Sequence, residues 1–266
     1  MSIDTGVAQF LNRMKLTDHF IDMIVPFLQK HGFVIHPFGY EEALHNTTGM
    51  DGLIRRKQFK KSEAALMVKF SPDFLNIYED VSRRKFFFAD SKTSITPVFF
   101  HSHIRRIQRR AKLPELHRGD IGEIEREAWI VYNRFFPKNQ VAIFMAAPYH
   151  RRLIVGEWVS NLTALYTHKA DENLEAAGSG TPHVNLHLGQ MRRLDDFLKQ
   201  EFGLKVDQGL YGILTDEVKK WGLNKSKGRV NWTQFNNAVN ELREEGCIWL
   251  KNYWGPTKTD PNQSTI

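Results

Sequence analysis

Apolar and polar residues repeat at helical spacing in the first part of the chain. In residues 17–31, apolar side chains recur three and four positions apart, which predicts an amphipathic helix. Thr17 is the expected N-cap, and Gly32 stands just past the expected end. Because Pro26 lies inside this pattern, we expect a kink there.

The middle of the chain carries strand patterns around a second helix. Short apolar runs predict strands at 33–38, 65–78 (interrupted at 71–73), 85–94 and 140–147. Between the last two, residues 121–136 have helical periodicity. The polar, basic segment 40–62 is expected to be a loop or insertion. This order of helix, strands, helix and strand predicts an α/β domain over residues 1–170.

The remainder of the chain is predicted to be mainly helical. A polar loop is expected at 168–183. Beyond it, the patterns predict helices at 189–202, 208–221 and 233–245, and then a strand at 247–254. We therefore expect a second domain at 185–256, in which a winged-helix arrangement is one alternative, and a disordered tail at 257–266.

Composition and charge narrow the class of protein. The 266 residues are 41% hydrophobic, with a net charge of +7 and a pI near 9.4, and this basic excess favours a polyanionic partner such as DNA. The single cysteine, Cys247, excludes an internal disulfide and a cysteine-built zinc site. The sequence contains neither a signal peptide pattern nor an apolar run long enough for a membrane span, so we expect a cytoplasmic protein.

The candidate chemistry lies on the two central strands. Asp73 is the acid of the only Pro-Asp pair of the chain, Pro72-Asp73, and Asp90-Ser91-Lys92 ends a strongly apolar strand. Two antiparallel strands joined by a turn would bring Asp73 beside Asp90. Their carboxylates, helped by the carbonyl of Ser91, are suited to Mg²⁺ or Mn²⁺. Lys92 projects to the same face as Asp90, so phosphodiester hydrolysis is the predicted reaction.

An acid-x-lysine triplet is by itself a weak signal, since about two are expected by chance in a chain of this size. A second triplet, Glu217-Val218-Lys219, lies in a helical pattern and is interpreted as a solvated helix face. The apolar strand before Asp90 and the Pro-Asp partner favour the first triplet as the active site over a surface ion pair.

With these motifs, the segment SPDFLNIYEDVSRRKFFFADSKTS resembles the PD-(D/E)XK nuclease superfamily, which is restriction-endonuclease-like. The resemblance spans roughly residues 15–160. It implies a mixed sheet flanked by helices and a magnesium-dependent endonuclease that acts on DNA in restriction, transposition or repair. It also implies an additional acid on the first core helix. Asp22, ten residues before Gly32, is the candidate, with Asp18, Glu41 and Glu42 as competitors.

Further residues are predicted to bind DNA or to border the site. The polar residues of the helix after the motif are interpreted mainly as its solvated face, with some at the rim of the site: Glu123, Glu125, Glu127, Tyr132 and Asn133. The candidate DNA contacts are basic or amide side chains: Arg105, Arg106, Arg109, Arg110, Lys225, Lys227, Arg229, Gln234 and Asn237.

Three alternatives stay open at this stage. The chain could be a non-catalytic DNA-binding protein that uses its C-terminal module, or the helix at 233–245 could be only a structural cap. It could also be an RNase or a nuclease subunit that a partner targets. A homodimer is neither required nor excluded.

Overall fold

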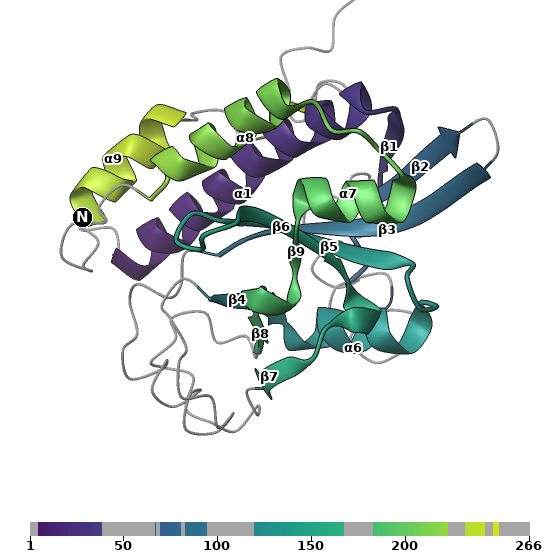
Figure 1. Cartoon of the computed structure of the whole chain (residues 1–266). Helices are drawn as coiled ribbons and strands as arrows, with labels where there is room; N and C mark the ends of the chain where they lie inside the picture. The colour runs from purple at the N-terminus through teal and green to yellow at the C-terminus, as the bar shows by residue number, and fades with distance from the viewer. Residues whose placement is uncertain are drawn as a thin grey trace, which may run out of the picture.

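A mixed six-stranded sheet lies at the centre of the molecule (Figure 1). The computed structural model describes residues 5–38, 67, 70–80, 83–94, 120–167, 183–222, 232–242 and 247–249. Along the sheet the order is β1 (Phe33–Pro37), β2 (Phe74–Asp80), β3 (Arg83–Thr93), β5 (Val141–Ala147), β6 (Leu153–Trp158) and β9 (Arg192–Arg193). Neighbouring strands are antiparallel except for β3 and β5, which are parallel. The predicted mixed α/β architecture with flanking helices is confirmed.

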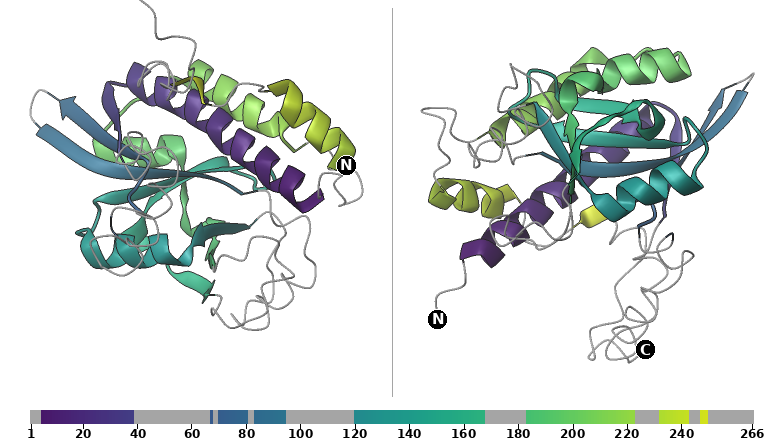
Figure 2. Two further views of the ribbon diagram at one scale, coloured as in Figure 1. Left: turned by 180° about the vertical axis from the view of Figure 1, so that it is seen from behind. Right: turned by 90° about the horizontal axis from the view of Figure 1, so that it is seen from below.

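Helices cover one face of this sheet. They are α1 (Thr5–Lys30), α7 (Leu194–Phe202), α8 (Gln208–Lys220) and α9 (Trp232–Leu242). Figures 1 and 2 show α1, α8 and α9 running side by side, although α9 follows α1 by some 200 residues of chain. Phe87 and Ala89 of β3 pack in this core with Phe20 of α1. Burial of such apolar side chains is the main source of stability for this layer.

The opposite face carries a second layer. It consists of α6 (Arg126–Phe135) and a small sheet with the order β4 (Ile121–Glu125), β8 (His183–His187) and β7 (Ala164–Thr167). Single 3-10 turns at Val159–Asn161 (η2) and Leu188–Gln190 (η4) complete the described elements on this side. Ile143 and Met145 of β5 are fully buried against this layer.

Helix α1 is longer than the sequence predicts. It begins at Thr5, so Thr17 is not its N-cap; the Thr17 hydroxyl instead donates to the carbonyl of Arg13. The helix continues through Pro26, whose ring is exposed. Its end is as predicted, because Gly32 adopts φ +90°, a conformation that glycine tolerates best.

The helix predicted at 121–136 is divided between two elements. Residues 121–125 form β4, and only Arg126–Phe135 are helical. Ile121 and Ile124 are spaced by three residues, which suits a helix, but pairing with β8 overrides this local preference. Gly122 allows close packing in the strand, since an added Cβ would lie 2.6 Å from the Met145 sulfur.

The predicted division into an α/β domain and a separate helical domain is not what the described residues form. Strands β8 and β9 pair with β4 and β6, and α7, α8 and α9 share one apolar core with α1. The strand predicted at 247–254 is corrected at its start, because residues 248–249 are helical, and residues 250–254 lie outside the described residues. The expected loops at 40–62 and most of 168–183 and the tail at 257–266 lie outside the described residues.

Candidate active site

The register of β2 and β3 brings the two predicted carboxylates together. Phe74 pairs with Ala89, so Asp73, immediately before β2, lies opposite Asp90. The backbone N–H of Ser91 donates to Oδ2 of Asp73 at 2.8 Å. Because side chains alternate along a strand, Asp90 and Lys92 share the face that α6 covers.

The carboxylate of Asp90 is held by two donors. Lys92 Nζ lies 2.6 Å from its Oδ1, and the hydroxyl of Tyr132 donates to its Oδ2 at 3.0 Å. Asp90 is only 1% exposed, whereas the Lys92 side chain is 31% exposed. The site is therefore buried at Asp90 and opens to solvent at Lys92.

Burial and the neighbouring charges shift the pKa values of Asp73, Lys92 and Tyr132. Burial, and then the adjacent Asp90 carboxylate, raise the pKa of Asp73 well above its usual range. Burial alone would lower the pKa of Lys92, but the carboxylates of Asp90 and Asp73 outweigh it and raise that pKa. Burial and Asp90 also raise the pKa of the Tyr132 phenol, which therefore remains a hydrogen-bond donor at neutral pH. The site thus has one cation beside two mutually repelling acids.

This donor set fits a hard divalent cation. Carboxylate oxygens are preferred ligands of Mg²⁺, which usually binds one or two protein carboxylates and keeps several waters. Among the described residues, no group of three or more histidine, cysteine, aspartate or glutamate side chains is arranged to hold a metal. Asp73 and Asp90 would therefore be the side-chain ligands. The sequence suggests the Ser91 carbonyl as a further ligand. The contact that Ser91 makes with Asp73 is through its backbone N–H and does not involve that carbonyl.

Two neighbours of the site are not singled out by the sequence pattern. Tyr132 falls on the predicted polar face of its helix, yet it is buried and contacts Asp90 directly. Glu125, the last residue of β4, lies near enough for its charge to contribute to the raised pKa values of Lys92 and Tyr132. The tyrosine follows Asp90 by 42 residues, so no local spacing could have indicated the contact.

The assignment of Asp22 to this site is corrected by its contacts. Its helix, α1, packs on the sheet face opposite to that of Asp90 and Lys92. Its carboxylate accepts hydrogen bonds from the thiol of Cys247 at 3.0 Å and from the backbone N–H groups of Ile248 and Trp249 at 3.1 and 2.8 Å. Asp22 thus anchors the C-terminal segment onto α1. Asp18 lies on the same helix, and Glu41 and Glu42 are outside the described residues.

The two predicted DNA contacts that the structure describes lie on α9 and not at the carboxylates. Gln234 and Asn237 are exposed on α9, which packs against α1 through Phe235 and Val239. Asn12 of α1 donates to the Asn236 amide oxygen at 2.7 Å, which also joins the two helices. The other candidates lie outside the described residues: Arg105, Arg106, Arg109, Arg110, Lys225, Lys227 and Arg229.

The second acid-x-lysine triplet behaves as expected for a helix surface. On α8, Glu217 pairs with Lys220 at 2.7 Å, and Lys219 pairs with Asp216 at 2.8 Å. Residues two apart on a helix point in different directions, so Glu217 and Lys219 do not face each other. The strand setting of Asp90 and Lys92 is what brings an acid and a lysine at this spacing into contact.

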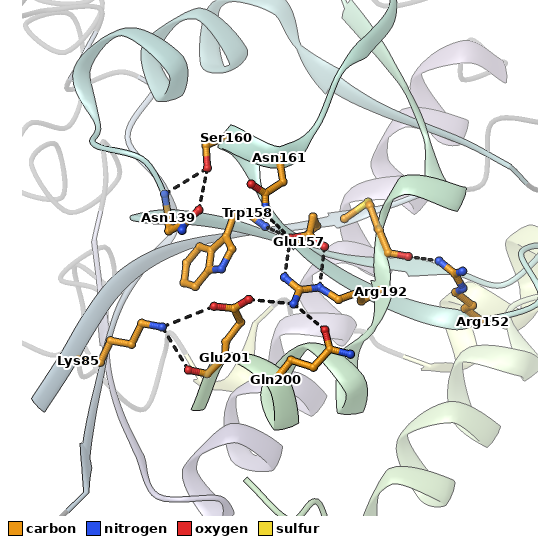
Figure 3. A network of polar contacts seen from close by, with 11 residues as sticks. Lys85, Asn139, Arg152, Glu157, Trp158, Ser160, Asn161, Arg192, Gln200 and Glu201 are labelled. Carbon is orange, nitrogen blue, oxygen red and sulfur yellow. Dashed lines mark hydrogen bonds and ion pairs between the residues drawn. The ribbon is translucent and has the colours of Figure 1, made fainter. Parts of the chain in front are cut away.

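A second charged cluster joins β6, β9, α7 and β3 (Figure 3). The Arg192 guanidinium holds the buried Glu157 carboxylate through two hydrogen bonds of 2.7 and 2.6 Å. It also donates to Glu201 at 2.8 Å, and Lys85 lies 3.6 Å from Glu201. We refer to Glu157, Arg192, Glu201 and Lys85 as the Arg192 cluster. Its two acids and two bases leave it balanced in charge.

Comparison of the chain with protein-family models, with curated proteins and with solved structures found no match. Among the described helices, none has both the length and the apolar character that a membrane span needs.

Proposed function

We propose that this protein is a divalent-cation-dependent nuclease that hydrolyses phosphodiester bonds of DNA. The observation that carries the proposal is the convergence of Asp73, Asp90 and Lys92 on one face of the β2–β3 pair. Two adjacent carboxylates, of which Asp90 is buried and Asp73 half-buried, are costly to keep without a counter-charge, and an arrangement of this kind is typical of functional sites.

Asp73 and Asp90 are the proposed ligands of Mg²⁺ or Mn²⁺. When bound, such an ion polarises the phosphate and lowers the pKa of a coordinated water. Lys92 is protonated beside the two acids, so in this proposal it stabilises the negative charge that develops on the phosphate rather than accepting a proton.

The arrangement of elements supports the same class. A helix and a strand precede the motif, and a helix and an apolar strand follow it, which is the order that the resemblance to PD-(D/E)XK nucleases implies. In the structure this order is α1, β1, the motif strands β2 and β3, then α6 and β5, with the short strand β4 inserted directly before α6. The restriction-endonuclease-like fold is part of the proposal. Asp22 on α1 contacts residues 247–249 and not the site, which is a departure from the family pattern.

DNA is the proposed substrate because of the net charge of +7. The basic residues at 105–110 and 225–229 are proposed to bind its backbone. A non-catalytic DNA-binding protein is the second candidate, and exposed Gln234 and Asn237 on α9 are the observation that favours it. A winged helix at the C-terminus and a homodimer both remain predictions.

The direct test is cleavage of duplex DNA by the full chain with Mg²⁺ or Mn²⁺. We expect cleavage with either ion and none in EDTA, while Ca²⁺ should support binding but little cleavage because of its longer bonds and looser geometry. Asp90→Asn should abolish cleavage and leave DNA affinity unchanged or slightly higher, since a negative charge is removed.

Glu217→Gln is the matched control, because it neutralises the acid of the other acid-x-lysine triplet. It should cleave like the wild type. DNA binding without cleavage under every ion would favour the second candidate, and an active Asp90→Asn protein would rule out this site. RNA substrates in the same assay distinguish an RNase.

A further inference from the structure

Tyr132 lies outside the predicted motif, and its hydroxyl donates a hydrogen bond directly to the Asp90 carboxylate. It lies in the middle of α6, and its ring is 4% exposed and packs near Phe136, with ring centroids 6.2 Å apart. The helix is fixed against the buried strand β5, which runs parallel to β3. The hydroxyl therefore approaches Asp90 from a rigid part of the fold.

The two donors to Asp90 differ in one important respect. Lys92 contacts Oδ1 of Asp90 and is positively charged, so it would repel a metal ion bound to the same oxygen. Tyr132, on Oδ2, brings a hydrogen bond without any formal charge. A neutral donor can fix the rotation of a carboxylate while leaving its negative charge available to a cation.

A backbone contact fixes the carboxylate of Asp73. The Ser91 N–H donates to Oδ2 of Asp73, so each carboxylate has one oxygen bound by an uncharged donor. Oδ1 of Asp90 accepts from Lys92, and the two carboxyl groups also contact each other, so an incoming ion would share these oxygens with Lys92 or replace the contact between the acids. Tyr132 is the donor that holds Oδ2 of Asp90 in this arrangement.

We propose that Tyr132 is a positioning residue, which orients the Asp90 carboxylate for binding of the divalent cation. The inference rests on the proposed function, since it assigns Tyr132 to the same metal site. Tyr132 does not touch the reacting atoms, and its role is exerted through Asp90.

The test is calorimetric titration of the full chain with MnCl₂ in the absence of DNA. Tyr132→Phe keeps the ring and its packing but removes the hydroxyl, and should weaken Mn²⁺ binding about tenfold. In cleavage assays, the Mg²⁺ concentration for half-maximal rate should rise by a similar factor, with a smaller change at saturating Mg²⁺. Circular dichroism establishes that the variant is folded.

Tyr211→Phe is the matched control. Tyr211 is also buried, but it lies on α8, on the other side of the sheet, where it contacts Phe27. This variant should bind Mn²⁺ like the wild type, so a loss common to both variants would be a general effect of removing a buried hydroxyl and would overturn the inference.

The outcomes separate this inference from the proposed function. If the wild type cleaves DNA and Tyr132→Phe binds Mn²⁺ with unchanged affinity, the positioning role is overturned and the nuclease stands. If the wild type binds Mn²⁺ more tightly than Tyr132→Phe but cleaves no nucleic acid, the positioning role stands and the nuclease does not. A wild type that binds no Mn²⁺ overturns both.

Discussion

The Arg192 cluster and the candidate site each contain two acids, but they differ in the number of bases that face those acids. In the Arg192 cluster, two acids face two bases, and Glu157 is held by a bidentate guanidinium. At the candidate site, Lys92 is the one base among the described side chains that contact the two acids, because the other donor, Tyr132, carries no charge. The first arrangement satisfies its charges within the protein, whereas the second has an excess of acid, which is where the proposed function places a cation.

The pKa values follow this difference. Burial raises the pKa of both Asp73 and Glu201, but around Glu201 the side chains of Trp158 and Arg192 outweigh burial and the net shift is downward. For Asp73, burial and then the Asp90 carboxylate raise the pKa more than Lys92 lowers it, so the net shift is upward. The comparison favours a structural role for the Arg192 cluster, and under the proposed function the candidate site gives up stability in exchange for cation binding.

The largest effect on stability should come from breaking the balanced cluster. Arg192→Ala removes the guanidinium and leaves the buried Glu157 carboxylate without its main partner. We expect the free energy of unfolding to fall by about 3–5 kcal/mol. Urea denaturation measures it, and a loss below about 1 kcal/mol would contradict the assigned structural role.

At the candidate site the main effect should be on rate. Lys92→Ala removes the charge assigned to the transition state, so cleavage at saturating Mg²⁺ should slow by about 10²-fold, or roughly 2.7 kcal/mol. Single-turnover cleavage measures this step. Lys219→Ala, in the helical triplet on α8, is the control and should cleave at the wild-type rate. Equal rates for all three proteins would exclude Lys92 from the chemistry.

Added cation should stabilise the protein through the unbalanced cluster. At a Mg²⁺ concentration ten times its Kd, linkage predicts a gain of about 1.4 kcal/mol in the free energy of unfolding. Thermal unfolding with and without MgCl₂ tests this. Asp90→Asn should lose the gain, whereas Arg192→Ala should keep it in whatever fraction remains folded. A gain that survives in Asp90→Asn would place the ion elsewhere.

The smallest effect concerns pH. Because the folded-state pKa of Asp73 is raised, this group contributes most stability below its unfolded pKa, and that contribution is lost as the pH rises. Without metal, Asp73→Asn should therefore be more stable than the wild type at pH 7 by about 1 kcal/mol, with the difference vanishing near pH 4. The asparagine oxygen can still accept from Ser91.

Glu201→Gln should give the opposite pH response. The lowered pKa of Glu201 means that its contribution is present above its unfolded pKa and is lost as the pH falls. The variant should be less stable than the wild type at pH 7, with a smaller difference near pH 4. Thermal unfolding of both variants across this range tests the comparison, which fails if the two shift in the same direction.

Local patterns in the sequence were sufficient to predict the strands of the motif and the core of the site. Alternation along β3 puts Asp90 and Lys92 on one face, and a short turn to β2 brings Asp73 opposite Asp90. The end of α1 at Gly32 and the buried strand β5 were equally local. In each case the information lies within about twenty residues of chain, where periodicity and turn geometry restrict the structure.

Only the tertiary structure decided which residues surround that core. Asp22 has suitable chemistry and spacing, but α1 packs on the far face, where its carboxylate holds the backbone of Ile248 and Trp249. Tyr132 reaches Asp90 because α6 covers the near face. Residues 121–125 became β4 through pairing with β8, whose residues follow by some 60 positions. Such contacts depend on how distant segments bury their apolar faces against each other, and no local repeat in the sequence specifies that choice.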